Sequence, residues 1–182
     1  MIVFNQINMS DIFRLLSYSF LIILSAINTS YAQNVSVADD SDVVVPVITQ
    51  GIYQILEKEE VSVLTKDNSK HDFIVEVART AEEQNKGLMF RTTVPEKTGM
   101  LFLFEGEKLR SFWMKNTQVS LDIIFIKKNG LIHHIHPNAE INTLDPISST
   151  GGVSAVLEIA AGEADRLGIK IGDSVLHNAF IQ

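Results

Sequence analysis

The 182-residue sequence predicts an α+β fold that is mainly antiparallel β, a compact barrel-like sheet with two short helices. Short apolar segments, separated by turn residues, indicate seven or eight strands. Only two segments carry a helical pattern, and both are brief. The sequence is 46% hydrophobic, which is ordinary for a globular domain and argues against a coiled coil or a disordered chain.

Residues 1–32 are predicted to be a signal peptide. The uncharged apolar stretch 15–27 follows Arg14 and is shorter than the roughly 20 residues that a membrane-spanning helix needs. Small side chains at Ser30 and Ala32 suit signal peptidase, so cleavage is expected after Ala32. The rest of the chain is then periplasmic or otherwise extracytoplasmic. The alternative is an uncleaved anchor, the one case in which we expect a membrane contact.

Residues 33–60 are predicted to be an acidic linker, and residues 61–182 a β-rich domain. Asp39, Asp40 and Asp42 resist packing, and Pro46 cannot donate to a central strand. The net charge of −7 argues against a nucleic-acid partner, which requires a basic surface. The absence of Cys excludes disulfides and thiol chemistry.

The first half of the domain is predicted to begin with a hairpin of strands 61–65 and 73–78. Thr80 and Glu83 have the spacing of a capping box, so a short helix should run to about residue 86 and stop at Gly87. The continuous apolar run 100–104 is typical of a buried strand, and a separate strand is expected at 110–115.

The second half is predicted to contain a strand at 121–127 and a hairpin turn at Asn129-Gly130. We expect a type I′ turn, which needs positive φ at both central residues. Residues 138–152 are expected to form a long loop, followed by a strand at 153–159. A helical turn at 163–167 should end at Gly168, and a last strand should cover 175–180.

Several short motifs follow one another at characteristic distances in this domain. They are Gly87-Leu88-Met89-Phe90-Arg91, Gly99-Met100-Leu101-Phe102, Phe112-Trp113-Met114-Lys115-Asn116-Thr117, Leu121-Asp122-Ile123, Leu157-Glu158-Ile159 and Gly168-Ile169-Lys170-Ile171-Gly172-Asp173. Together they resemble the DUF192 (UPF0127) family over residues 75–175. The resemblance implies a small protein, often exported or membrane-tethered, and implies no particular reaction.

Five residues are candidates for a ligand-binding cleft: Arg91, Trp113, Lys115, Asn116 and Asp122. In a strand, Trp113 and Lys115 share one face, whereas Met114 and Asn116 share the other. An aromatic wall with a few placed charges suits a sugar or a small anion. We therefore expect a noncatalytic envelope module that binds a small ligand, a glycan or an envelope protein. No resident cofactor or metal is predicted.

Structural roles are the alternatives for each candidate. Trp113 could fill the core, and Arg91 could form an ion pair with Glu82, Glu83 or Asp122. Asp122 could lie on a solvated face or cap a turn, since a carboxylate in an apolar run is costly unless paired or exposed. Glu158 and Asp173 are assigned to a strand end and a turn, with no chemical role.

Two other functions stay open. One is a hydrolase or transferase in which Asp122 is the general base and Lys115 or Arg91 stabilises charge. The other is a metal carrier, because His134 and His136 share one strand face and His71, His177 or a Met could supply a third ligand.

Overall fold

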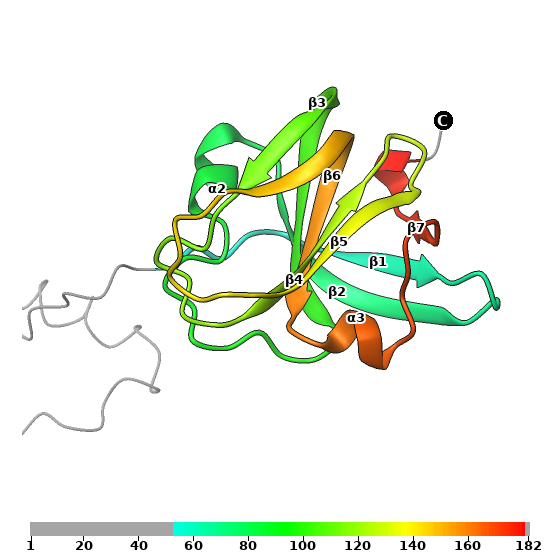
Figure 1. Cartoon of the computed structure of the whole chain (residues 1–182), viewed down its shortest axis with the longest axis horizontal. Coiled ribbons are helices and arrows are strands. Elements are labelled where there is room, and N and C mark those ends of the chain that lie inside the picture. The colour runs from blue at the N-terminus through cyan, green and yellow to red at the C-terminus, as the bar shows by residue number, and fades with distance from the viewer. Residues whose placement is uncertain (1–52, 181–182) are drawn as a thin grey trace, which may run out of the picture. The chain divides into compact units, whose positions relative to one another are not determined.

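A computed structural model describes residues 53–180, so the predicted signal peptide and most of the predicted linker lie outside the described residues. One sheet of seven strands is ordered β5-β4-β6-β3-β2-β1-β7 (Figure 1). The strands are β1 (Lys58–Leu64), β2 (Lys70–Ala78), β3 (Thr98–Phe112), β4 (Leu121–Ile126), β5 (Ile132–Ala139), β6 (Ile147–Ala160) and β7 (Ser174–Leu176). The helices are α2 (Ala81–Lys86), α3 (Glu163–Arg166) and the 3₁₀ turn η2 (Asn178–Phe180).

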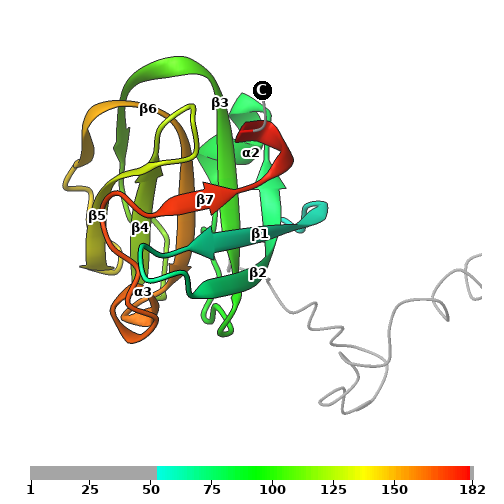
Figure 2. The same ribbon diagram turned by 90° about the vertical axis from the view of Figure 1, so that its right-hand side faces the viewer.

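The sheet curls into a barrel-like form. All neighbouring strands are antiparallel except β2 and β3, which run parallel. The backbone N–H of Val175 donates to the carbonyl of Gly130 at 2.8 Å, and that of Ile132 donates to Asp173 at 2.9 Å. These bonds bring β7 to the start of β5 (Figure 2). The predicted α+β, mainly antiparallel, barrel-like fold is therefore confirmed.

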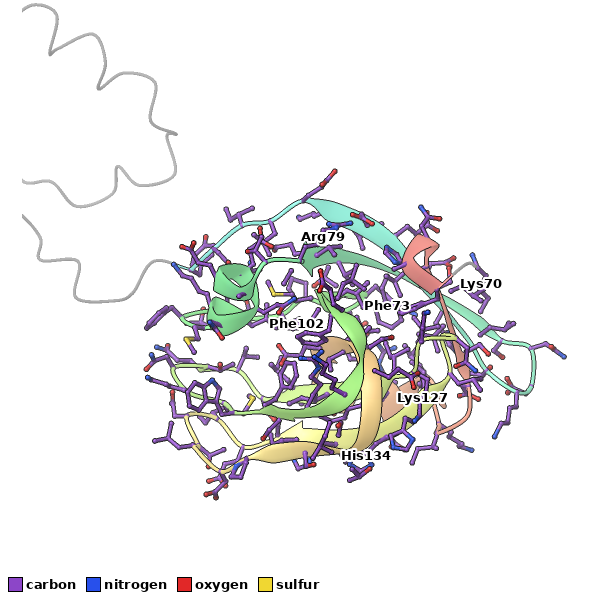
Figure 3. The ribbon with its side chains drawn as sticks, turned by 90° about the horizontal axis from the view of Figure 1, so that it is seen from above. Lys70, Phe73, Arg79, Phe102, Lys127 and His134 are labelled. Carbon is purple, nitrogen blue, oxygen red and sulfur yellow. The ribbon has the colours of Figure 1, made fainter. Side chains whose placement is uncertain are left out.

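Strand alternation divides the core into two clusters. We call the first the barrel cluster; it includes Val61, Phe73, Leu101, Ile124, Leu157 and Val175. We call the second the outer cluster; it includes Leu88, Met100, Phe102, Met114, Ile123 and Val156. Figure 3 shows Phe102 near α2 and Phe73 away from it. The outer cluster therefore occupies the side of the sheet that α2 covers.

The longest strands, β3 and β6, bend together over the top of the sheet in Figure 1. Their pairing shifts register between Leu103 and Lys108, and Gly106 adopts a φ of +66° within this irregular stretch. The two predicted strands 100–104 and 110–115 are thus one bent strand that ends at Phe112. The predicted loop 138–152 is likewise shorter, because the ladder continues from Ile147.

The α2 helix begins at the predicted capping box. The backbone N–H of Glu83 donates to Thr80 Oγ1 at 3.2 Å, and Glu83 Oε2 accepts from the N–H of Thr80 at 2.8 Å. The helix ends at Gly87, whose φ is +47°. A Cβ at Gly87 would lie only 3.2 Å from Phe102 Cζ, so the missing side chain lets the helix end pack against this ring.

Three local predictions were wrong in detail. Only Gly130 has positive φ in the predicted type I′ turn; Lys127 N donates to Leu131 O, so the loop is a wider turn closed by a left-handed glycine. The last strand stops at Leu176 and continues as η2. The domain also begins before residue 61: β1 starts at Lys58, and the Leu56 N–H donates to Glu76 at 2.8 Å.

Within residues 53–180, no helix combines the length and apolar character needed to cross a membrane.

Candidate functional site

A cleft of about 580 Å³ lies between α2 and the bent end of β3, and we call it the main cleft. Its walls carry both apolar and polar side chains. The apolar lining residues are Leu88, Met89, Phe102, Phe104, Leu109, Phe112, Trp113, Met114, Leu144 and Pro146. This volume and lining are typical of small-molecule sites.

Phe112 stands at the centre of this aromatic wall. Its ring makes edge-to-face contacts with Phe102, Phe104 and Phe125 at centroid distances of 5.2, 6.3 and 6.0 Å. Such contacts fix ring orientation as well as burying area. Contacts within the protein therefore hold the aromatic rings of this wall in place.

One acid, Glu158, lines the main cleft among these apolar groups. The residue is 5% exposed. It is paired on β6 with Met100 of β3 and Ile123 of β4, both members of the outer cluster. Strand alternation directs Glu158 to the same face as Val156, which also belongs to that cluster. A carboxyl group therefore sits in apolar surroundings and borders the cleft.

Burial raises the pKa of Glu158 to about 8, because desolvation disfavours the carboxylate ion. A group with that pKa is about nine-tenths protonated at pH 7. The protonated carboxyl can donate one hydrogen bond through its O–H and accept others. The cleft therefore offers a neutral hydrogen-bonding group beside its apolar side chains.

The rim of the main cleft exposes large apolar side chains. Leu109 is 67%, Trp113 53% and Leu144 65% exposed. Lys115 Nζ lies 5.4 Å from the centre of the Trp113 ring, whereas Met114 between them is buried. The predicted sharing of one side by Trp113 and Lys115 is confirmed, even though β3 has ended at Phe112.

The structure gives Asn116 a position in a turn. Its φ is +55°, a left-handed conformation that Asn tolerates better than most residues. Its carbonyl accepts the N–H of Phe90 at 2.7 Å, which ties the turn after β3 to the segment after α2. The side chain of Asn116 does not line the main cleft.

Asp122 is fully buried and accepts three backbone hydrogen bonds. Oδ1 accepts from Asn138 at 2.9 Å and from Gly162 at 3.0 Å, and Oδ2 accepts from Ala164 at 2.9 Å. The carboxylate thus holds the end of β5 and the first turn of α3 against β4. Asp122 was expected, as one alternative, to cap a turn. It does act as a cap, but the element that it caps is the start of α3.

Arg91 lies in a different hollow of about 180 Å³. Its Nη2 is 2.7 Å from Glu76 Oε2 and 2.6 Å from the carbonyl of Gln54, and its guanidinium lies 5.4 Å from the Tyr53 ring centre. The predicted ion pair of Arg91 with Glu82, Glu83 or Asp122 is therefore wrong. The partner is the buried Glu76, which β2 places beside the guanidinium.

The five predicted residues do not surround one hollow. Trp113 lines the main cleft and Arg91 the smaller one, whereas Lys115, Asn116 and Asp122 line neither. The reason is that Arg91 and Asp122 are each engaged by partners that lie far away in sequence: Glu76 for the guanidinium and the start of α3 for the carboxylate.

The histidines do not converge on one point. His134 stacks on Phe125 with 5.8 Å between ring centres, and His177 Nε2 lies 2.8 Å from Glu59 Oε2. Burial, with His136 and His133 nearby, lowers the pKa of His134. In the described part of the chain, no three or more His, Asp or Glu side chains gather as a metal site would require.

Glu158 is the site residue that the sequence interpretation missed. The rule applied to Asp122, that a carboxylate in an apolar run needs a partner or solvent, applies equally to Glu158 in the run 155–159. The residue was assigned to a strand end, but it lies within β6, which continues to Ala160. The apolar run was therefore the available signal.

Comparisons with known proteins identify a family and similar structures. The model of the DUF192 family, described as "Uncharacterized ACR", matches residues 62–177. A protein of Sinorhizobium meliloti 1021, named as a candidate transcription regulator, has a similar crystal structure: TM-score 0.67, 36% identity, covering 69% of this chain and 98% of that one. A protein of unknown function from Novosphingobium aromaticivorans DSM 12444 has TM-score 0.65 and 43% identity, covering 67% and 86%. No curated protein matches the chain.

Proposed function

We propose that this chain, which belongs to the DUF192 family of uncharacterised proteins, is an exported, noncatalytic binding module. The geometry of its main cleft supports binding of a small, largely apolar molecule against Glu158. The single observation that carries the proposal is a buried carboxyl group in an aromatic-walled cleft of about 580 Å³. Neither the family description nor the similar structures name a ligand, so the support is physical.

The exposed rim supports binding of an apolar molecule. Leu109, Trp113 and Leu144 are each more than half exposed at the mouth of one cleft, so a ligand could remove apolar surface of all three from water. Each Å² of apolar surface buried contributes about 25 cal/mol. The protonated Glu158 supplies one directional contact, which would orient the ligand within the cleft.

The same lining supports binding over hydrolysis. Among the described residues that line the main cleft, Glu158 is the one carboxylic acid. A glycosidase pair needs a second carboxyl about 5–9.5 Å away. Asp122, the base in the hydrolase or transferase alternative, is fully buried and accepts three backbone N–H groups, which leaves no contact with the cleft.

The proposed ligand is not a nucleic acid. The Sinorhizobium relative is named as a candidate transcription regulator. A DNA-binding role in this chain would require a basic surface, whereas its net charge is −7. The proposed export, based on the apolar stretch 15–27, would also separate the domain from the genome.

A fluorescence titration tests the binding proposal. Trp113 is the sequence's one tryptophan and lines the cleft, so energy transfer to a bound dye reports occupancy. We expect the neutral dye N-phenyl-1-naphthylamine to quench Trp113 saturably at one molecule per full-length chain. The double variant Leu109→Ser/Leu144→Ser should bind it about fivefold to tenfold more weakly.

Ile171→Ser is the matched control, because Ile171 is 55% exposed and does not line the cleft. It should leave the dye affinity unchanged. Absence of saturable quenching in the wild-type chain, or equal weakening by the control and the double variant, would overturn the proposal.

Export is tested separately by fractionating cells that express the full-length chain. We expect the protein in the extracytoplasmic fraction with Gln33 as its first residue. Ile22→Arg, which places a charge in the apolar stretch, should retain the precursor in the cytoplasm. A wild-type chain found uncleaved in the cytoplasm would contradict export, and an uncleaved chain in the membrane fraction would favour the anchor.

A further inference from the structure

We infer that the ligand is an amphipathic organic anion, whose apolar body fills the main cleft while its charged group lies against the guanidinium of Arg110. This inference rests on the proposed function and names the chemical class of its ligand. It is carried by the position of Arg110, by the charges around it and by the neutral state of the acid inside the cleft.

Arg110 lies where the main cleft meets a second hollow of about 480 Å³. Both hollows are lined by Gln84, Phe104 and Arg110, so they adjoin at these residues. The guanidinium carbon lies 4.1 Å from the centre of the Phe104 ring. Such stacking holds the planar donor group against the wall and leaves its edge free for an anion.

The hydrogen-bonding capacity of Arg110 is largely unused. Its Nε is buried without a partner among residues 53–180, and its Nη2 makes one long contact of 3.4 Å to the Glu105 carbonyl. None of the ion pairs found in this part of the chain includes Arg110. A guanidinium in this state can bind a carboxylate, sulfonate or phosphate with two parallel hydrogen bonds.

The charged residues around Arg110 are mostly cationic, although the chain as a whole carries a net negative charge. Lys86 lines the main cleft, and Lys108 and Arg79 line the second hollow, although Arg79 also pairs with Glu59. One acid, Glu105, faces them there among the described lining residues. A concentration of cations around these two adjoining hollows, in a chain of net charge −7, favours an anionic ligand where they meet.

The acid inside the cleft is compatible with this ligand. Glu158 is buried among apolar side chains and has a pKa of about 8, so near neutral pH it is mostly uncharged and does not repel an anion. An ionised carboxylate in the same position would oppose the attraction of Arg110. The cleft therefore combines apolar walls, one neutral acid and a cationic mouth.

Two dyes that differ by one sulfonate group test the inference on the full-length chain. N-phenyl-1-naphthylamine is neutral, and 1-anilinonaphthalene-8-sulfonate is the same molecule with an anionic group. We expect the sulfonate dye to bind about tenfold more tightly at low salt, an advantage that Arg110→Gln should abolish. Because Arg110 lines the main cleft, the neutral dye is measured in the same variant, and the ratio of the two affinities is the readout.

Lys170→Gln is the matched control, since it removes the same charge from an exposed residue outside both hollows. It should preserve the advantage of the sulfonate dye. If Arg110→Gln does not fold, a salt titration of the wild-type chain replaces it. The advantage of the sulfonate dye over the neutral dye should then shrink as salt screens the charge.

The outcomes separate the two claims. If neither dye binds, the proposed function fails and the inference with it. If the neutral dye binds but the sulfonate gives no advantage, or the advantage survives Arg110→Gln, the inference fails while the proposed function stands. If the inference holds, competition by 4-phenylbutyrate or by phenyl phosphate identifies a carboxylate or a phosphate as the preferred anionic group of the ligand.

Discussion

The Oδ2 atom of Asp122 accepts a 2.9 Å hydrogen bond from the backbone N–H of Ala164, in the first turn of α3. Its Oδ1 atom accepts two further backbone hydrogen bonds, from Asn138 and Gly162. A helix start has N–H groups without partners inside the helix, and this carboxylate supplies one. Asp122 therefore belongs to the framework that joins β4, β5 and α3.

Replacing Asp122 by Asn should destabilise the domain by about 2–4 kcal/mol, because one carboxylate oxygen is replaced by an NH₂ group, which cannot accept a backbone hydrogen bond. Urea unfolding followed by circular dichroism measures this change. Asp145→Asn is the control, since Asp145 is exposed in the loop between β5 and β6. Equal stability of Asp122→Asn and the wild type would contradict the framework role.

Arg91→Gln should reduce the free energy of unfolding by roughly 3 kcal/mol, because Glu76, whose side chain is 7% exposed, loses its cationic partner. The double variant Arg91→Gln/Glu76→Gln should recover part of the loss, since no unpaired charge remains buried. N-phenyl-1-naphthylamine should bind the folded fraction of both variants normally, because Arg91 lies outside the main cleft. Weakened binding at unchanged stability would restore Arg91 as a ligand residue.

Glu158 should make the domain less stable as the pH rises from about 5 to 8. The pKa of this carboxyl is about 8 in the fold and 4.5 for the ordinary group, so in this range the unfolded chain gives up a proton that the folded chain keeps. The stability is fully present below pH 4.5 and is lost as pH rises through 8. The loss should be on the order of 3–5 kcal/mol.

Glu158→Gln removes this titration, so the variant should lose the decline between pH 5 and 8. His134 acts in the opposite sense, because its lowered pKa makes the unfolded chain bind more protons near pH 6.5. The difference between wild type and Glu158→Gln at each pH cancels that contribution. Parallel stability curves for the two proteins would show that Glu158 does not titrate in this range.

Trp113→Ala should separate binding from stability. Because Trp113 is 53% exposed, we expect a stability change within about 1 kcal/mol. The affinity for N-phenyl-1-naphthylamine, followed by the dye's own emission, should fall severalfold because part of the cleft wall is missing. A large loss of stability with unchanged affinity would instead assign Trp113 to the core.

Signals that depend on neighbouring residues predicted the fold well. The capping box of Thr80 and Glu83 and the first hairpin are each specified within a few residues, and both are confirmed. The bend of β3 could not be predicted, because the register shift after Leu103 arises from pairing with β6 more than forty residues later. The end of β3 at Phe112 follows from the same distant pairing.

The candidate site was predictable only in part. The prediction that Trp113 and Lys115 share one side is confirmed, although both residues follow the end of β3 and Lys115 lies in a turn. Whether Arg91 meets Asp122 depends on topology, and the structure pairs Arg91 with Glu76 instead. Glu158 could be recognised as unusual from its apolar neighbours, but its position at the main cleft depends on how α2 and the end of β3 cover β6.

The most direct test is a ¹³C NMR titration of the Glu158 side-chain carboxyl in the full-length chain, with and without saturating N-phenyl-1-naphthylamine, assigned by comparison with Glu158→Gln. The account predicts a pKa near 8 without the dye, and a higher one with it because the dye excludes water from the carboxyl. A pKa near 4.5 that the dye does not change would contradict a buried, protonated acid at a ligand cleft.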